Sequence, residues 1–184
     1  MRVLMVNDHD PASAFGGAEV YVDRLAAALR GRGHAVESHF ASSDRPRRSR
    51  LWDLWDPSAR SALIERVRTF EPDVVHVHGF VRELSPSVLV ATGRPTVLTF
   101  HDLRVLGGSE HRFPDPRAVA GQVWVTPVSL RLARRLSAVT AVAQVMSAAL
   151  EANGLPAAGV LPAPVPGPLV PPADVRDCHD VVYA

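Results

Sequence analysis

Three polar clusters in the sequence carry side chains that can move protons or bind phosphate. The first spans residues 8–17, the second contains His76 and His78, and the third is His101 with Asp102. Each cluster directly follows a short apolar run that predicts a β-strand. Because ligands of open α/β sheets bind beyond the carboxyl ends of the strands, we expect the three clusters to meet at one rim.

The first cluster ends in Gly16 and Gly17, at the start of an expected helix. A glycine pair lets the backbone approach a ligand closely, and the amides of a helix N-terminus attract anions. This pattern predicts binding of an anion such as a diphosphate, with Glu19 in the first helical turn. Since the pattern is not the G-x-G-x-x-G fingerprint, a flexible loop before a helix is the alternative interpretation.

Two carboxylates, Asp8 and Asp10, flank His9 in an Asp-x-Asp pattern that carries a divalent metal in some enzymes. Pro11 follows at once, so the chemistry of a turn explains the pattern equally well. We expect Asp8 to line the cleft and no metal to bind there.

The second cluster places His76 and His78 two residues apart on a strand, so both imidazoles face the same side of the sheet. Ligand contact and metal coordination both fit this arrangement. A metal needs a third ligand, which His101, Asp102 or His111 would have to supply. Histidines that serve only the structure are the remaining alternative. We expect His78 to line the cleft without a metal.

The third cluster puts a titratable imidazole, His101, at the end of an apolar strand. There it can hydrogen-bond a hydroxyl or a phosphate of a substrate. Its neighbour Asp102 either holds the tautomer of this imidazole or points away and caps the next segment. A histidine with a purely structural role is the third interpretation. We place His101 at the centre of the predicted site.

The alternation of apolar runs with helical patterns predicts the elements that position these clusters. It indicates an α/β fold, Rossmann-like, with a doubly wound parallel sheet and helices on both faces. The expected strands are 2–6, 35–40, 74–78, 96–100, 138–142 and an edge strand at 160–161. The expected helices are 18–30, one starting at Asp56-Pro57 and ending before Glu71, a short one after Ser85-Pro86, 127–136 and 144–152. Residues 103–123 are expected to form an irregular loop.

Helical spacing also predicts which side chains these helices bury. In the first helix the buried stripe should be Tyr21, Leu25, Ala28 and Leu29. In the helix that begins at Pro57 it should be Ala59, Leu63, Val67 and Phe70.

The composition excludes several classes of protein. The chain has 184 residues, 47% of them hydrophobic and 21% charged, which suits one α/β domain with a core. All 20 basic residues are arginine, so a Walker-A loop, a Schiff-base lysine and a pyridoxal-phosphate anchor are excluded. The formal net charge of +1 gives no general basic field, and we expect no nucleic-acid partner.

The sequence also bears on the cellular compartment. A single cysteine, Cys178, excludes an internal disulfide and a C-x-x-C zinc site. No apolar run has the length of a membrane span, and the N-terminus lacks a signal-peptide layout, so a cytoplasmic location is expected. The basic residues Arg47, Arg48 and Arg50 lie beside Trp52 and fit either peripheral contact with an anionic membrane surface or a solvated loop.

The C-terminal part of the sequence differs from the rest. Seven of the 16 prolines lie between Pro156 and Pro172, a density typical of an extended linker. Residues 180–184 then read as a strand that has nothing to pair with. We assign 1–165 to the Rossmann-like domain and 166–184 to a linker followed by the first strand of an absent domain.

Four segments follow one another in a characteristic order. They are MRVLMVNDHDPASAFGGAEVYVDRLAAALRGRGHAV, EPDVVHVHG, LSPSVL and GRPTVLTFHD. This order resembles the N-terminal, acceptor-side domain of family-4 glycosyltransferases with the GT-B architecture. The tail from Val160 is similar to the linker and opening strand that lead into the second domain of that family, and the resemblance is weakest over 103–126.

The resemblance implies an enzyme that moves a sugar from a nucleotide-sugar to a hydroxyl-bearing acceptor, with retention at the anomeric carbon and no obligatory metal or other cofactor. It gives Gly16 and Gly17 the contact with the donor diphosphate. It gives His101 the catalytic position beside the donor sugar. The other expected cleft residues are His78, Asp102, Glu19 and Asp8.

The donor-binding domain of that family has no counterpart in the 184 residues. Because departure of a diphosphate needs charge neutralisation, we expect that the chain does not turn over alone. Two other functions stay open on the sequence: a non-catalytic module that binds a phosphorylated or glycosylated ligand, and a metal-dependent hydrolase built on His76, His78 and His101.

Overall fold

The computed structural model describes residues 1–12, 16–41, 54–81, 83–106 and 116–163, without the side chains of 116–124. Within these residues, six strands pair in parallel to form one sheet in the order β2-β1-β3-β4-β5-β6. The strands are β1 (Arg2–Asn7), β2 (Ala35–Phe40), β3 (Val74–Val77), β4 (Thr96–Phe100), β5 (Ala138–Ala141) and β6 (Gly159–Val160). The Rossmann-like α/β fold predicted from the sequence is therefore confirmed.

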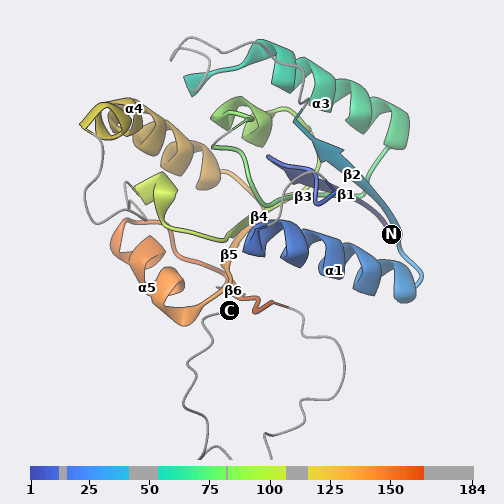
Figure 1. The fold of residues 1–184 in the computed structure, drawn as a ribbon. Coiled ribbons are helices and arrows are strands. Elements are labelled where there is room, and N and C mark those ends of the chain that lie inside the picture. Colours follow the sequence, from blue (N-terminus) through green and yellow to red (C-terminus); the bar gives the residue numbers. More distant parts are fainter. Residues whose placement is uncertain (13–15, 42–53, 82, 107–115, 164–184) are drawn as a thin grey trace, which may run out of the picture.

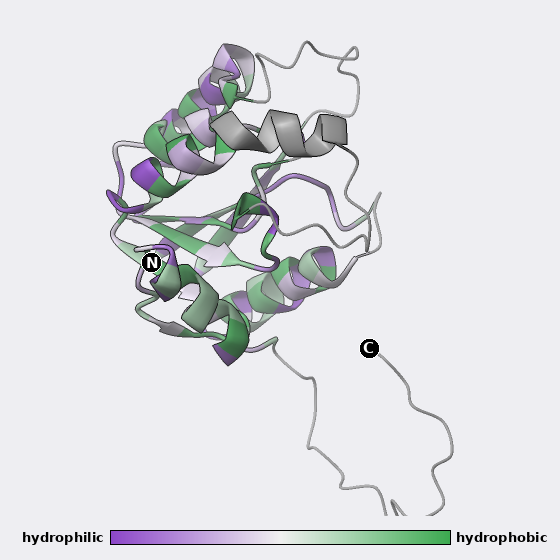
Figure 2. Cartoon of the chain, turned by 90° about the vertical axis from the view of Figure 1, so that its left-hand side faces the viewer, coloured by the Kyte–Doolittle hydropathy of each residue, from purple (hydrophilic) through white to green (hydrophobic). Residues whose placement is uncertain are grey.

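Helices cover both faces of this sheet. They are α1 (Gly17–Gly31), α3 (Pro57–Phe70), α4 (Pro116–Ala133) and α5 (Gln144–Ala152), with short 3-10 turns η1 (Pro86–Val90) and η2 (Arg104–Leu106). The chain steps from β1 to β2 in one direction and takes every later step in the other. Right-handed crossovers then place α1 on one face and α3, α4 and α5 on the other, as Figure 1 shows. Figure 2 shows the sheet between the two layers.

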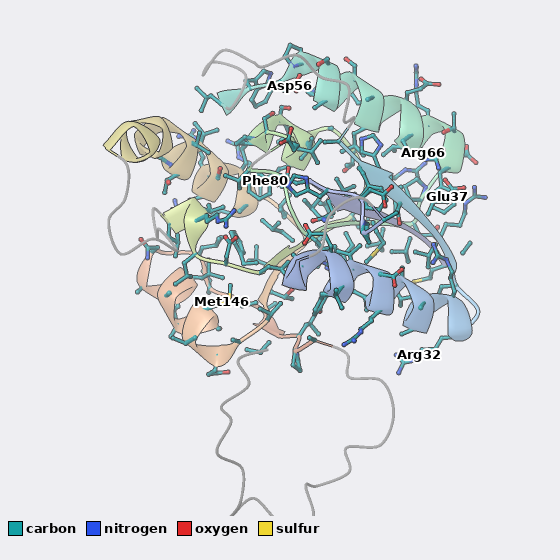
Figure 3. The ribbon with its side chains drawn as sticks, viewed as in Figure 1. Arg32, Glu37, Asp56, Arg66, Phe80 and Met146 are labelled. Carbon is teal, nitrogen blue, oxygen red and sulfur yellow. The ribbon has the colours of Figure 1, made fainter. Side chains whose placement is uncertain are left out.

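The start of α3 follows from its sequence. The Asp56 carboxylate accepts hydrogen bonds from the backbone N–H groups of Ser58 at 2.9 Å and Ala59 at 3.0 Å, and Pro57 occupies the first turn. Figure 3 shows Asp56 at this end of the helix. All four side chains that the spacing predicted to be buried are buried: Ala59, Leu63, Val67 and Phe70.

The buried stripe of α1 differs from the prediction at one position. Tyr21 is buried, Leu25 and Leu29 are partly buried, but Ala28 is exposed. The stripe instead includes Val22 and Ala26, because the face that meets the sheet is rotated slightly about the helix axis from the one we chose.

The expected helix at 127–136 and the expected loop at 103–123 are wrong in their bounds. The helix α4 already begins at Pro116 and ends at Ala133, with Pro127 in its interior, whereas we had placed Pro127 at a helix start. Pro116 has the first-turn position that proline favours. The helix packs against η1 and η2, and such packing can offset the backbone hydrogen bond that Pro127 does not donate. The last strand, β6, lies one residue before the predicted 160–161.

Candidate functional site

A cleft of about 600 Å³ lies at the carboxyl ends of β1, β3 and β4 and is closed on one side by the start of α1. Gly16 and Gly17 line it together with His101. The glycine pair and the imidazole therefore meet at one opening, as the position of the clusters on the strands predicted. The other predicted cleft residues also line it: Asp8, Glu19, His78 and Asp102.

The glycine pair forms the start of α1. Gly16 is the N-cap in an extended conformation, and no side chain among the described residues caps the helix there. The Glu19 carboxylate folds back against Gly16, into the space that a Cβ on that residue would need. Nothing lies within 4 Å of the Cβ position of Gly17, which is exposed. An anion can thus approach the backbone at Gly17 from open space.

Two strand ends bring His78 and His101 into direct contact. The Nδ1 atom of His78 and the Nε2 atom of His101 share a hydrogen bond of 3.0 Å. The Tyr21 ring from α1 packs edge-on against His101, with ring centroids 4.7 Å apart, and its hydroxyl donates to the carbonyl of Leu161 at 3.2 Å. Tyr21 was expected only as a core residue, and nothing in its spacing indicated this contact with the site.

His76 precedes His78 by two residues on the same face of the sheet, farther from the carboxyl edge, with ring centroids 4.0 Å apart. Its Nε2 atom is 2.7 Å from the hydroxyl oxygen of Thr99, which is in turn 2.7 Å from the hydroxyl of Thr140. These buried groups form a chain of hydrogen bonds across β3, β4 and β5. His76 therefore serves the structure behind the cleft, and it is absent from the cleft lining.

All three imidazoles have lowered pKa values. Burial lowers the pKa of His76 to about 4, and the neighbouring His101 acts in the same direction. Burial, with both neighbouring histidines, holds the pKa of His78 well below its usual range. Burial also lowers the pKa of His101 to about 4, although the Glu19 carboxylate opposes this. At neutral pH the rings are therefore uncharged, so His101 can form hydrogen bonds but carries no positive charge.

Asp102 caps the segment that follows it, which is the second of the two roles that the sequence left open. Its Oδ1 atom accepts from the backbone N–H of Arg104 at 3.0 Å, and its Oδ2 atom pairs with the Arg104 guanidinium at 3.4 Å. This is a cap on the segment after β4, where η2 begins. The geometry favours capping over an interaction that holds the tautomer of His101.

Asp8 connects the end of β1 to the segment that follows β3. Its buried carboxylate accepts hydrogen bonds from the backbone N–H groups of Val81, Glu83 and Leu84 at 2.8–3.0 Å. Burial raises the pKa of this carboxyl, and the three backbone bonds act against that rise. Its partner in the Asp-x-Asp pattern, Asp10, accepts from the N–H of Ala12 at 2.9 Å, which agrees with the interpretation as a turn.

Gly79 is a site residue whose role the sequence did not reveal. A Cβ at this position would lie 2.6 Å from Oδ1 of Asn7 and 3.1 Å from the backbone nitrogen of Asp8. Only glycine allows the segment after β3 to pass so close to the end of β1. The signal that would have found it is a glycine directly after a strand, next to a polar cluster.

The described residues contain no group of three or more His, Cys, Asp or Glu side chains arranged to hold a metal ion. The nitrogens Nε2 of His76 and Nδ1 of His78 are already engaged in hydrogen bonds. This geometry does not support the metal-dependent hydrolase that the sequence left open.

Several predictions fall on parts of the chain that the structure does not describe. These are the membrane contact through Arg47, Arg48 and Arg50, the ligand role of His111, and the linker and strand assigned to 166–184. Among the described helices, none is both long and apolar enough to span a bilayer.

A parallel α/β sheet with a polar cleft at its carboxyl edge defines a Rossmann-like ligand-binding domain. The sequence model of Glycosyltransferase Family 4 matches residues 15–166. This range includes the glycine pair and the histidines His76, His78 and His101. The chain thus belongs to glycosyltransferase family 4, and sugar transfer is the activity of that family. No curated protein matches the chain in a sequence comparison.

Proposed function

We propose that this chain forms the acceptor-side half of a retaining, nucleotide-sugar-dependent glycosyltransferase of the GT-B type. The observation that carries the proposal is the single cleft lined by Gly16, Gly17 and His101. In a sugar transfer, the diphosphate and the reacting sugar carbon are neighbours in the donor. An anion-attracting helix start beside a hydrogen-bonding imidazole is the arrangement that such a donor requires.

The glycine pair would meet the donor diphosphate. The first-turn amides of α1 and the helix dipole favour negative charge at this point. Gly17 has no atoms near its Cβ position, so the phosphate oxygens can come to the backbone itself. The Glu19 carboxylate repels an anion, and in this proposal it has to turn away from Gly16 when the donor binds.

His101 would contact the donor sugar beside the carbon that reacts. With its pKa lowered to about 4, it is neutral at pH 7 and contributes a hydrogen bond rather than a proton or a full charge. We infer that no metal or other cofactor is obligatory, and that the acceptor hydroxyl enters the cleft from the side of His78, Asp102 and Asp8.

Charge neutralisation of the leaving diphosphate is incomplete in this half. Among the described cleft residues, Arg104 is the sole arginine, and its guanidinium is paired with Asp102 at 3.4 Å. Since departure of a diphosphate depends on such neutralisation, we propose that the isolated chain neither transfers nor hydrolyses a nucleotide-sugar. Clear turnover of UDP-glucose or GDP-mannose by the purified chain would contradict this.

A pair of glycine variants tests the site itself. Gly17→Ala adds a methyl group to the cleft, and Gly31→Ala adds one at the other end of α1, where nothing lies within 4 Å either. The amide NMR spectrum of the chain is recorded during titration with UDP-glucose and with GDP-mannose. We expect shifts near Gly16 and His101 in the unmodified chain and in Gly31→Ala, and at least about a tenfold weaker response in Gly17→Ala.

Equal responses of the two variants would contradict a diphosphate at the helix start. Binding of a phosphorylated or glycosylated ligand in this cleft, with no response to any nucleotide-sugar, would instead favour the non-catalytic binding module.

A further inference from the structure

His101 has only one ring nitrogen left for a ligand. Its Nε2 atom is held by Nδ1 of His78 at 3.0 Å. Its Nδ1 atom has no hydrogen-bond partner within the described ranges and is not among their fully buried polar atoms. Any oxygen that binds this imidazole in the cleft must therefore meet Nδ1.

The position of the protons in the His78–His101 pair follows from counting. Two neutral rings carry two N–H groups, and one of these lies in the bond between the rings. The other is either on Nε2 of His78 or on Nδ1 of His101. These two arrangements present opposite chemistry to a ligand, because Nδ1 of His101 is an acceptor in the first and a donor in the second.

Burial distinguishes the two arrangements. Nε2 of His78 is fully buried and has no hydrogen-bond partner in the part of the chain that the structure describes. An N–H group at that atom would be a buried donor without an acceptor, which is among the rarest defects in folded proteins. At the other end of the pair the Glu19 carboxylate lines the same cleft as His101, and its charge favours an N–H on the side that faces it.

We propose that His78 is a positioning residue that donates its Nδ1–H to Nε2 of His101 and so holds the His101 proton on Nδ1, facing the cleft. His101 then offers an N–H donor to an oxygen atom of the ligand, and its one lone pair, on Nε2, accepts from His78 and does not face the cleft. The oxygen is a sugar hydroxyl or a phosphate oxygen. This identification of the ligand rests on the proposed function, whereas the tautomer does not.

Tyr21 and His78 hold the orientation of the His101 ring as well as the position of its proton. The Tyr21 ring packs edge-on against the His101 ring, with centroids 4.7 Å apart, and its centroid is 5.6 Å from that of the His78 ring. With one ring nitrogen bonded and the ring in T-shaped contact with Tyr21, the N–H direction is set before a ligand arrives. Such a preorganised donor is worth more to a developing negative charge than one that must rotate into place.

The test reads the tautomer directly, using nitrogen NMR of the whole chain labelled with ¹⁵N-histidine. We expect the proton of His101 on Nδ1 in the unmodified chain. His78→Asn retains an N–H donor near the position of Nδ1 and should keep this tautomer. His78→Leu removes the donor that fixes the tautomer, so a second population with the proton on Nε2 of His101 should appear. A residue that only fills space would not produce this difference between the two variants.

A proton on Nε2 of His101 in the unmodified chain overturns the proposal, and so does an unchanged tautomer in His78→Leu. If His78→Leu does not fold, the unmodified chain and His78→Asn still decide the question. Titration with the same two nucleotide-sugars adds the second readout: we expect about tenfold weaker binding for His78→Leu and less than about threefold for His78→Asn. Absence of nucleotide-sugar binding in every variant, together with the expected tautomers, would contradict the proposed function and leave this inference standing.

Discussion

Strands β3, β4 and β5 present two buried faces with different side chains. On the face toward α3, α4 and α5 the inward residues are apolar apart from Thr96 at the start of β4: Val75, Val77, Leu98, Phe100, Val139 and Ala141. On the face toward α1 the same strands begin with the apolar residues Val74, Val97 and Ala138. Nearer the carboxyl edge, this face carries a polar group that includes the residues directly after β3 and β4: His76, His78, Thr99, His101 and Thr140. Along each strand, these polar residues alternate with the residues of the opposite, apolar face.

The two faces gain their stability in different ways. The apolar face contributes mainly through burial, which is insensitive to pH. The polar face must compensate the cost of dehydrating its imidazoles and hydroxyls with hydrogen bonds, and it keeps its histidines neutral at pH values where an unfolded chain would protonate them. The polar face is also the one that leads to the cleft, since His78 and His101 directly follow β3 and β4. The candidate site thus lies on the face whose stability depends on pH.

Acidification should give the largest difference between the contributions of the two faces to stability, because the buried histidines lie on the polar face. The pKa of His76 is about 4 in the folded chain and 6.5 in the unfolded one. Above pH 6.5 both states are neutral at this ring. Between pH 6.5 and 4 the unfolded chain binds a proton that the folded chain does not, so the free energy of unfolding falls as the pH falls. Each such histidine removes about 2 kcal/mol between pH 6.5 and 5, which urea unfolding at several pH values will measure.

His76→Gln is the control for this prediction. Glutamine retains a polar group near the position of Nε2 but does not titrate, so the variant should lose the share of one histidine in the pH dependence, whatever its stability at pH 7. The histidines outside the cluster stay in both proteins and cancel. An identical pH dependence in the two proteins would show that His76 is not held neutral by the fold.

Truncation of the apolar face should have the next largest effect. Leu98 is fully buried, and Leu98→Ala should lower the free energy of unfolding by about 3 kcal/mol through lost burial and the remaining cavity. The loss should be the same at pH 7 and pH 5. Val90→Ala, at a side chain that is 37% exposed, is the matched truncation and should cost less than about 1 kcal/mol. A cost for Leu98→Ala no larger than that of Val90→Ala would contradict this account of the apolar face.

The sequence revealed one face more readily than the other. The alternation of apolar runs with helical patterns along the chain was enough to predict the strands, their parallel direction and the rim at which the polar clusters meet. It did not predict that His78 would bond to His101, because that contact depends on the register between β3 and β4 and on ring rotation. The contact of Tyr21 with the site depends on the position of α1 over the sheet, which no local pattern encodes.

The errors in the fold have a similar origin. Proline is the strongest local signal for the start or end of a helix, so Pro127 was placed at the beginning of a helix. In the structure α4 runs through that position and is held by contacts with η1 and η2. Tertiary packing therefore outweighed the local preference, as it did in α1, where Ala28 has helical spacing but lies on the exposed side.

The smallest of the expected effects concerns the hydroxyl chain behind the cleft. Thr99→Val keeps the shape of the side chain and removes the oxygen that lies 2.7 Å from both Nε2 of His76 and the hydroxyl of Thr140. Two buried polar groups each lose a partner, so the free energy of unfolding should fall by about 1–2 kcal/mol. Thr140→Val removes only the outer member of the chain and should cost less, about 1 kcal/mol.

The double variant shows whether these groups act as a chain. In Thr99→Val the Thr140 hydroxyl no longer has its hydrogen bond to Thr99. Adding Thr140→Val should therefore lower the free energy of unfolding by almost nothing further. Urea unfolding of both single variants and the double variant then gives a double-mutant cycle with a coupling of about 0.5–1 kcal/mol. Strict additivity would mean that the two hydroxyls contribute separately, and that the polar face is a set of independent pairs rather than one connected network reaching from β5 to His76.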